Sequence, residues 1–248
     1  MYVFGIGLHI VAAIFFAVHA IRTNQPMYWL FLLFLFPGLG SIVYAIAVWL
    51  PEMRSHRGVR RAGNKVKQLL DPGRELREAM EANQLSPSVG NQLRLAEALL
   101  EADRASEAVT HYQLALQGLY AGDPDIQSRL AKALLESGRP QDARELLERV
   151  IAEKPDYRSP PAHLTYARAV AATGDRDKAH EEFGVLVGYY PGLEARARYA
   201  ALLREWGDTD RAQTLAAESL REAQRLPAHT RGNEREWIAL LQKVDRGA

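Results

Sequence analysis

Two kinds of hydrophobic pattern divide the chain. Residues 2–21 and 27–50 are continuous apolar runs of 20 and 24 residues, separated by a short polar connector. Beyond residue 70, apolar residues recur every three or four positions between charged ones, which is the period of an amphipathic helix. The pattern predicts an all-α protein with an apolar head at 1–50, a linker at 51–70 and a helical body at 71–248.

Each apolar run is long enough to cross a bilayer, because about 20 helical residues cover a hydrocarbon core about 30 Å thick. The connector at 22–26 leaves room only for antiparallel neighbours, so we expect a transmembrane hairpin of two spans. A cleaved signal peptide would need a basic start and a shorter apolar core, and the head has neither.

Charge gives the expected orientation. Residues 1–50 contain one ionised side chain, Arg22, whereas residues 51–67 contain six Lys/Arg and one acid, Glu52. Cations flank the cytoplasmic ends of spans, so both termini are predicted to be cytoplasmic and the protein to lie in a bacterial inner membrane. The cluster also suits contact with anionic lipid headgroups. Its members are Arg54, Arg57, Arg60, Arg61, Lys65 and Lys67.

Small or polar residues recur every four positions in the first run, and a small pair follows in the second. Small side chains let helices approach closely, so packing within the hairpin explains them. A homodimer through the same face is the alternative. The positions are Gly5, His9, Ala13, Ala17, Ser41 and Ala45.

A proline interrupts the second run. Pro37 removes a backbone donor, and we expect it to kink the helix. The surrounding pattern resembles the N-terminal membrane hairpin of cardiolipin synthases and related phospholipase D-type proteins. This resemblance implies an anchor with the following domain in the cytoplasm. The paired H-x-K-x4-D motifs that phosphatidyl transfer needs are absent. The resemblance rests on Trp29, Phe36, Pro37, Gly40 and Tyr44.

The body repeats with a period near 35 residues. Segments 95–116, 130–151, 166–187 and 199–220 align without gaps. Alanines recur in both helices of each unit at spacings of 35, 36 and 33 residues, and three of the four turns contain glycine. The alanines are Ala96, Ala131, Ala167 and Ala200, then Ala108, Ala143, Ala179 and Ala212. The turn residues are Asp103, Gly138, Gly174 and Gly207.

This repeat resembles the tetratricopeptide repeat (TPR), a helix–turn–helix unit. The resemblance implies an α-solenoid of about four repeats over 88–227, with small residues at helix crossings and a large apolar residue in each second helix. That position holds Tyr112, Leu147, Phe183 and, in the fourth unit, Ala216. The family's tryptophan early in the first helix is replaced by Gln92, Gln127, His163 and Arg196.

Solenoid ends need polar caps. Asp71 and Pro72 begin a predicted N-terminal helix at 71–85. A capping helix is predicted at 232–244, with Asn233 as N-cap and Glu236 three residues on.

A solenoid binds through its concave face, and the resemblance implies that the first helices line it. Cations on these helices suit a peptide carboxylate or an acidic segment. The equal alternative is ordinary surface pairing with Glu97, Glu101, Glu136 and Glu205. The six cations are Arg94, Arg129, Lys132, Arg168, Arg198 and Arg204.

Composition narrows the chemistry. The chain has no cysteine, which excludes disulfides and thiolate sites. It has no phosphate-loop, zinc-protease or serine-hydrolase motif, so no enzyme activity, cofactor or metal is predicted. Residues 68–248 hold 24 Lys/Arg and 29 Asp/Glu, a net charge of −5, which argues against nucleic-acid binding.

The sequence therefore predicts a membrane-anchored adaptor or scaffold that recruits protein partners to the cytoplasmic membrane face. A non-catalytic regulatory subunit of a lipid-modifying or envelope-biogenesis membrane enzyme is the alternative. The sequence specifies neither the partner, the pathway nor the oligomeric state.

Overall fold

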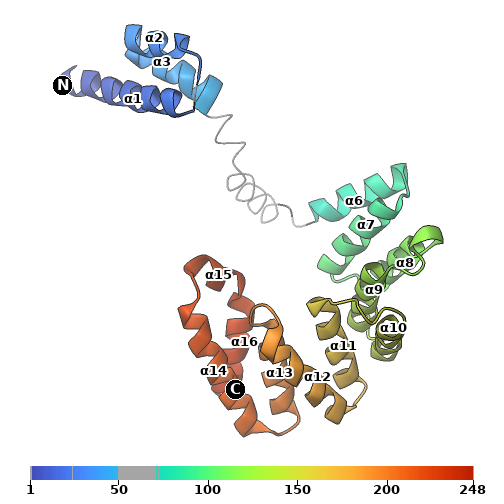
Figure 1. The fold of residues 1–248 in the computed structure, drawn as a ribbon. Helices are drawn as coiled ribbons and strands as arrows, with labels where there is room; N and C mark the ends of the chain where they lie inside the picture. Colours follow the sequence, from blue (N-terminus) through green and yellow to red (C-terminus); the bar gives the residue numbers. More distant parts are fainter. Residues whose placement is uncertain (1, 24, 50–70, 72, 248) are drawn as a thin grey trace. The chain divides into compact units, whose positions relative to one another are not determined.

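A computed structural model describes residues 2–23, 25–49, 71 and 73–247, which include fourteen α-helices and no strand (Figure 1). The all-α prediction is confirmed for these residues. They fall into two compact units, Met1–Arg74 and Glu75–Ala248. The predicted linker at 51–70, with its six cations, lies outside the described residues.

The first unit contains one long helix and several short ones. α1 (Tyr2–Arg22) is followed by α2 (Tyr28–Leu35), α3 (Pro37–Tyr44) and a π-helix, η1 (Ala45–Trp49). Within the part of the chain that is described, no helix combines the length and the hydropathy needed to cross a membrane. Side chains 1–11, including part of the small-residue stripe, are outside the described set.

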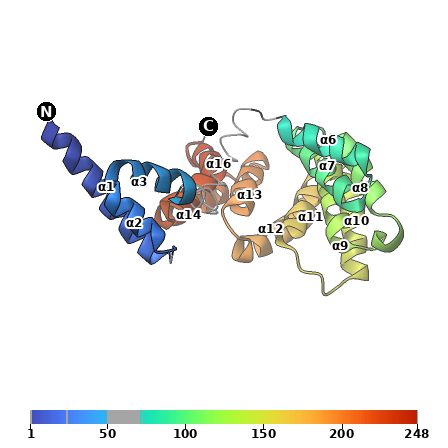
Figure 2. The same cartoon turned by 90° about the horizontal axis from the view of Figure 1, so that it is seen from above.

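The second apolar run is not the single kinked helix that the sequence predicted. Helix α2 ends at Leu35, Phe36 has φ −134° and ψ 74°, and Pro37 is the first residue of α3. A Cβ added to Gly40 would lie 2.5 Å from the carbonyl oxygen of Leu32, a contact that a continuous helix cannot make. The chain therefore reverses at Phe36, and α2 and α3 lie side by side against α1 (Figures 1 and 2).

Proline explains where this reversal occurs. The first residue of a helix has no intrahelical N–H bond to lose, and the fixed φ of proline suits that position. Pro37 therefore starts a helix here, whereas the sequence prediction placed it inside one.

Tyr44 holds the three helices of this unit together. Its side chain is fully buried with Ala20 and Leu33. Its hydroxyl oxygen lies 3.1 Å from Nδ1 of His19, and its ring lies 5.2 Å from that of Trp29, centroid to centroid. Two residues of the family-like motif, one on each arm, thus meet across the reversed chain.

The second unit is a row of helix pairs preceded by α6 (Arg74–Leu85). The predicted N-terminal helix is thus present but begins three residues later than expected, with the Arg74 N–H donating to the Asp71 carbonyl. A short 3-10 helix, η2 (Gly118–Tyr120), separates the first two pairs. The pairs are α7 (Val89–Glu101) with α8 (Ala105–Ala115), α9 (Pro124–Glu136) with α10 (Pro140–Glu153), α11 (Pro160–Ala172) with α12 (Arg176–Tyr189), and α13 (Glu194–Glu205) with α14 (Thr209–Arg225).

The repeat positions behave as predicted. All eight packing alanines are fully buried, because the helices cross closely and admit only a methyl group. The large-residue position is buried in every unit, at Tyr112, Leu147, Phe183 and Ala216. The four turn residues adopt positive φ, including Asp103 at 58°, where the other three are glycines.

Side-chain caps start many of these helices. Ser88, Asp123, Ser159, Asp175 and Asp208 each accept a backbone N–H at the first turn of the helix that follows.

The C-terminal cap differs in detail from the prediction. Asn233 ends α15 (Ala228–Asn233), and α16 (Arg235–Asp245) follows with Glu234 at its N-cap position. The carboxylate of Glu234 accepts the backbone N–H of Leu193 at 3.0 Å. The predicted N-cap role of Asn233 is therefore wrong. The predicted capping helix is present, and its Leu241 and Val244 are buried against the last repeat.

Candidate functional site

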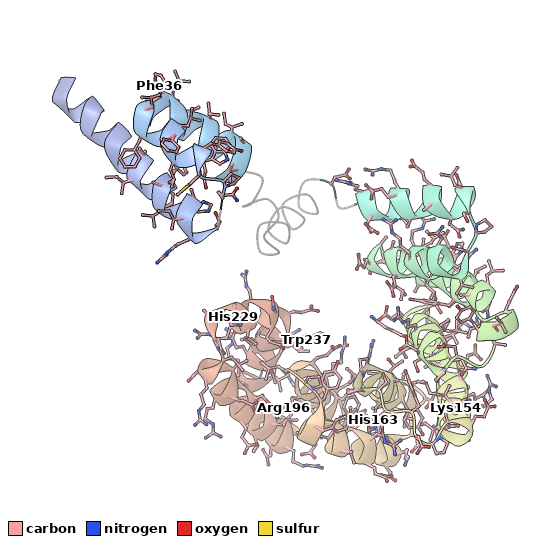
Figure 3. The ribbon with its side chains drawn as sticks, turned by 45° about the horizontal axis from the view of Figure 1, so that its top comes forward. Phe36, Lys154, His163, Arg196, His229 and Trp237 are labelled. Atoms are coloured by element: carbon pink, nitrogen blue, oxygen red, sulfur yellow. The ribbon has the colours of Figure 1, made fainter. Side chains whose placement is uncertain are left out.

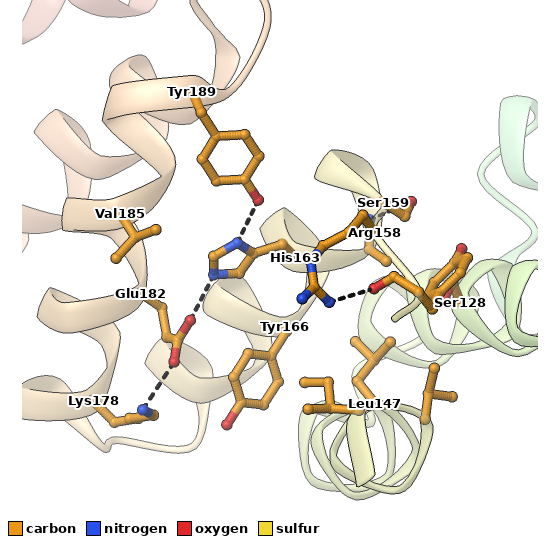
Figure 4. Close-up of a pocket in the computed structure, with 14 residues that line it drawn as sticks. Ser128, Leu147, Arg158, Ser159, His163, Tyr166, Lys178, Glu182, Val185 and Tyr189 are labelled. Atoms are coloured by element: carbon orange, nitrogen blue, oxygen red, sulfur yellow. Dashed lines mark hydrogen bonds and ion pairs between the residues drawn. The ribbon is translucent and has the colours of Figure 1, made fainter. Parts of the chain in front are cut away.

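A cavity of about 520 Å³ opens between the second and third helix pairs (Figure 4). We call it the inter-repeat groove. It is formed by α10, α11, α12, one residue of α9 and the segment between α10 and α11. Its lining residues are Ser128, Leu147, Val150, Ile151, Tyr157, Arg158, Ser159, Ala162, His163, Tyr166, Lys178, Glu182, Val185 and Tyr189.

The groove has a buried apolar wall and an exposed apolar rim. Leu147 and Val150 are each 2% exposed. In contrast, Ile151, Val185 and Tyr189 are 55%, 56% and 49% exposed. Apolar side chains gathered around a concave site, and not scattered singly, are typical of a binding surface.

A chain of polar side chains runs along one side of the groove. The Tyr189 hydroxyl lies 2.6 Å from Nδ1 of His163, and Nε2 of the same ring lies 2.6 Å from Glu182 (Figure 4). Lys178 Nζ lies 2.9 Å from the other oxygen of Glu182. A neutral imidazole satisfies both contacts by donating from Nε2 to the carboxylate and accepting from the hydroxyl at Nδ1.

Electrostatics favour the ionised form of Glu182. The hydrogen bond from His163 lowers the pKa of this carboxyl most, and Lys178 lowers it further, against the opposing effect of burial. Because the carboxylate is only 16% exposed, these two partners replace most of its water.

The order hydroxyl–imidazole–carboxylate resembles that of a hydrolytic triad. Burial raises the pKa of Tyr189, which keeps its hydroxyl protonated and able to donate to Nδ1 of His163. The described residues also contain no group of three or more His, Asp or Glu placed to hold a metal ion. The arrangement instead joins α11 to α12 and holds the tyrosine ring at the rim of the groove.

Tyr157 adds an unused polar group to the groove wall. Its hydroxyl is buried and has no hydrogen-bond partner among the described residues. Buried polar atoms are nearly always satisfied, so each exception calls for an explanation.

The six cations predicted for the concave face do not line this groove. Three of them link successive first helices: Arg94 to Glu75 of α6 at 2.8 Å, Arg129 to Glu97 of α7, and Arg168 to Glu136 of α9 at 3.8 Å. We call this series the ion-pair ladder. Two of its acids, Glu97 and Glu136, were expected to pair with surface cations. Arg168 is the least exposed arginine of the ladder, and burial lowers its pKa.

The remaining three cations also have partners within the chain. Lys132 lies 4.0 Å from Glu136. Arg198 lies 2.9 Å from Glu194, and its guanidinium carbon lies 4.7 Å from the centre of the Trp237 ring. Arg204 donates to the carbonyl oxygens of Lys243 and Gly247 at the C-terminal end. Recognition of a carboxylate by these six cations stays a prediction.

Sequence reasoning missed the chain Tyr189–His163–Glu182, although one signal pointed to it. His163 occupies the position where the repeat family keeps tryptophan. In the first unit the same position is Gln92, whose Oε1 lies 2.6 Å from Nδ1 of His111. In both units the partner lies nineteen residues downstream on the second helix. In these two units the polar replacement at the tryptophan position bonds the two helices of the repeat, whereas Gln127 of the second unit donates to the Ala121 carbonyl before α9.

Comparison with known proteins supports the predicted type of repeat. A family model described as tetratricopeptide repeat matches residues 99–159 and 134–205. Together the two matches span residues 99–205, which are similar to tetratricopeptide repeats. The TPR prediction is thus confirmed for the central helix pairs, which include the whole inter-repeat groove. The resemblance of the head to the hairpin of cardiolipin synthases stays a prediction.

One solved structure supports the same fold. A thermophilic TPR protein of Thermus thermophilus is similar with a TM-score of 0.54 and 19% identity, covering 72% of this chain and 96% of that one. The TPR-like repeats of a kinesin light chain of Podosopora anserina give a TM-score of 0.48 and 21% identity, covering 64% and 93%. No curated protein matches the chain significantly. TPR domains typically bind protein partners, which suggests an adaptor or scaffold role.

Proposed function

We propose that this protein is a TPR adaptor that binds a segment of a partner protein in the inter-repeat groove. The observation that carries the proposal is the exposed rim formed by Ile151, Val185 and Tyr189 over a buried apolar wall. An exposed rim of this kind costs free energy in water and recovers it when a partner covers it.

The groove indicates the chemistry of that segment. Apolar side chains of the partner fit between Leu147 and Val185. Arg158, whose hydrogen bonds go to backbone carbonyls, supplies positive charge at the edge, which favours an acidic residue next to the apolar ones. The ion-pair ladder, whose cations already have acidic partners, is the weaker candidate.

The proposal places this adaptor at the cytoplasmic face of a bacterial inner membrane, held there by the head. Two features support the location. Residues 23–50 contain no ionised side chain, and residues 51–67 contain six cations and one acid. Apolar segments without charge partition into lipid, and cations next to them favour the cytoplasmic side.

Photo-crosslinking in cells tests the binding site. A photoreactive phenylalanine analogue at Tyr189 or Ile151 should join the protein to a discrete partner, and Val185→Glu should abolish the product. The same analogue at Leu114, which is 43% exposed outside the groove, is the control. A further analogue at Arg129 tests the ion-pair ladder. Crosslinked products from that position alone would move the binding site to the ladder. No specific product from any position would count against the adaptor.

The regulatory-subunit alternative is supported by the resemblance of the head motif to the membrane hairpin of cardiolipin synthases. Replacing residues 1–50 with an unrelated membrane anchor separates the two functions. The adaptor should keep its crosslinks and its cellular role, whereas a subunit that binds through the head should lose the role.

A further inference from the structure

The reversed chain at residues 28–44 has dimensions that decide how the head meets lipid. Helices α2 and α3 contain eight residues each, so each is about 12 Å long at 1.5 Å per residue. The hydrocarbon core of a bilayer is about 30 Å thick. The α2–α3 pair alone therefore reaches less than halfway across. Even with the five residues of η1, the second arm is shorter than the core, and the chain returns toward the side from which it entered.

The hairpin has one apolar tip and one open end with polar groups. Phe36 lies at the tip, where the chain turns between α2 and α3 (Figure 3). Trp29 and Tyr44 meet at the open end, and the hydroxyl of Tyr44 lies beside His19. Tyr28, which is 61% exposed, lies beside Trp29 at this end, and Trp and Tyr favour the boundary between lipid and water. The open end therefore belongs at the membrane surface and the tip in the acyl chains.

The backbone at the tip is compatible with lipid. The N–H of Phe36 donates to the Leu32 carbonyl, and the Phe36 carbonyl accepts the N–H of Gly40 at 2.7 Å. Proline at the next position contributes no N–H. An unbonded polar group in hydrocarbon costs several kcal/mol, so both features lower the cost of a turn inside the membrane.

The outer surface of the hairpin suits the acyl chains of a lipid bilayer better than it suits a protein partner. Large apolar side chains are exposed on both arms and at the tip, with exposures of 55% to 82%, and residues 23–50 contain no ionised side chain. A protein interface has an apolar centre with a polar rim, whereas this surface is apolar on every arm. The side chains are Phe31, Phe34, Leu35, Phe36, Leu39 and Ile42.

Charge supports the same arrangement. Arg22 ends α1, three residues after His19, which contacts Tyr44 at the open end of the hairpin. In a two-span hairpin, Arg22 and the six cations of 51–67 would lie on opposite membrane faces. With a reversed chain they share one face, which places every cation of the first 67 residues on the side that positive residues favour.

We infer that residues 28–44 enter one leaflet as a re-entrant hairpin, so that the connector at 23–27 and the basic segment at 51–67 lie on the same membrane face. The inference rests on the membrane attachment proposed above and replaces the predicted second span. The motif residues then have separate roles: Phe36 and Pro37 make the turn, Gly40 lets the arms touch, and Trp29 and Tyr44 close the open end.

Single cysteines test this geometry cleanly, because the chain has no cysteine of its own. The full-length variants Gln25→Cys, Phe36→Cys and Ser86→Cys report the connector, the tip and the body. Each is treated with a membrane-impermeant maleimide in intact spheroplasts, after lysis, and after detergent is added. We expect Gln25→Cys and Ser86→Cys to react only after lysis, and Phe36→Cys to react only in detergent.

Other outcomes are equally clear. Reaction of Gln25→Cys in intact spheroplasts while Ser86→Cys stays protected would restore the two-span hairpin and overturn the inference, leaving the anchor intact. Reaction of Phe36→Cys without detergent would place the tip in water. Oxidation of Phe36→Cys to a disulfide-linked dimer would place the tip against a second copy of the chain. Either result would also overturn the inference. Recovery of the chain outside the membrane fraction would reject membrane attachment itself. Labelling of both Gln25→Cys and Ser86→Cys from outside would reverse the orientation and support the re-entrant geometry.

Discussion

The ring of Phe183 lies flat against the ring of Tyr199, with centroids 5.2 Å apart and planes only 3° from parallel. Phe183 is fully buried on α12 and Tyr199 is 6% exposed on α13, so the stack joins the third repeat to the fourth. In a solenoid each repeat is stabilised mainly by its neighbour. This stack is therefore a specific point at which the two repeats are coupled.

A double-mutant cycle measures that coupling. Phe183→Leu and Tyr199→Leu should each destabilise the body, and the pair should cost less than their sum by about 1 kcal/mol, the usual value of an aromatic contact beyond its buried area. Urea denaturation of the full chain in mild detergent gives the free energies. Tyr199→Phe is the control, because it keeps the ring and removes only the hydroxyl near His180 and Arg211. Full additivity of the two leucine variants would show that the stack carries no coupling.

The turn of the first repeat contains a residue whose backbone conformation is unfavourable. Asp103 has φ 58°, whereas the equivalent residues Gly138, Gly174 and Gly207 carry no Cβ. A side chain in this region costs about 1 kcal/mol, somewhat less for aspartate. Asp103→Gly should therefore raise the free energy of unfolding by about 0.5 kcal/mol or more.

The reverse exchange is its matched test. Gly138 has φ 80°, and a Cβ added there would meet no atom within 4 Å, so Gly138→Asp introduces strain without a clash. It should lower stability by about 1 kcal/mol. Thermal unfolding of both variants gives the answer, and equal shifts in the same direction would be inconsistent with backbone strain as the cause.

The sequence predicted the body well because its restraints are local and repeated. A helix crossing that admits only a methyl group leaves an alanine in every unit, and a turn with positive φ leaves a glycine in three of four. Ser159 and Asp175 likewise mark the starts of helices, because a short side chain with an oxygen can accept a free backbone N–H of the first turn.

The structures of the head and of the inter-repeat groove were harder to predict from the sequence, for physical reasons. An uncharged apolar run has the same composition whether it crosses the membrane or turns back within it. The close approach of Gly40 to Leu32 is what separates the two cases. The chain Tyr189–His163–Glu182 depends on the orientation of two helices and on side-chain rotamers, neither of which follows from spacing alone.

The pair formed by Glu182 and His163 makes part of the stability depend on pH. The pKa of Glu182 is lowered in the folded protein, first by the hydrogen bond to His163 and then by Lys178. Its stabilising contribution is thus present above the pKa of the unfolded chain, about 4.3, and is lost as the pH falls through the lower folded value. Glu182→Gln should cost about 1–2 kcal/mol at neutral pH and progressively less toward about pH 3.

Glu181→Gln is the matched control for this titration. Glu181 also pairs with Lys178 at 2.9 Å, but its side chain is 67% exposed, so its loss should change stability by less than about 1 kcal/mol at any pH. Denaturant unfolding between about pH 3 and pH 7 gives both curves. A difference between wild type and Glu182→Gln that does not shrink in acid would contradict the assigned titration.

Gly40 decides whether the two arms of the head can touch. Any side chain there places a Cβ 2.5 Å from the backbone oxygen of Leu32, and a backbone atom cannot move aside as the end of a flexible side chain can. Gly40→Leu should therefore separate α2 from α3 and expose the rings of Trp29 and Tyr44 to their surroundings. Ile42→Leu is the control, since Ile42 is 59% exposed and faces away from the contact. In the Phe36→Cys chain, maleimide reactivity in lysed membranes without detergent should rise in the Gly40→Leu variant and stay unchanged in the control. Equal protection in both variants would mean that the close contact of the arms does not hold the tip in the membrane.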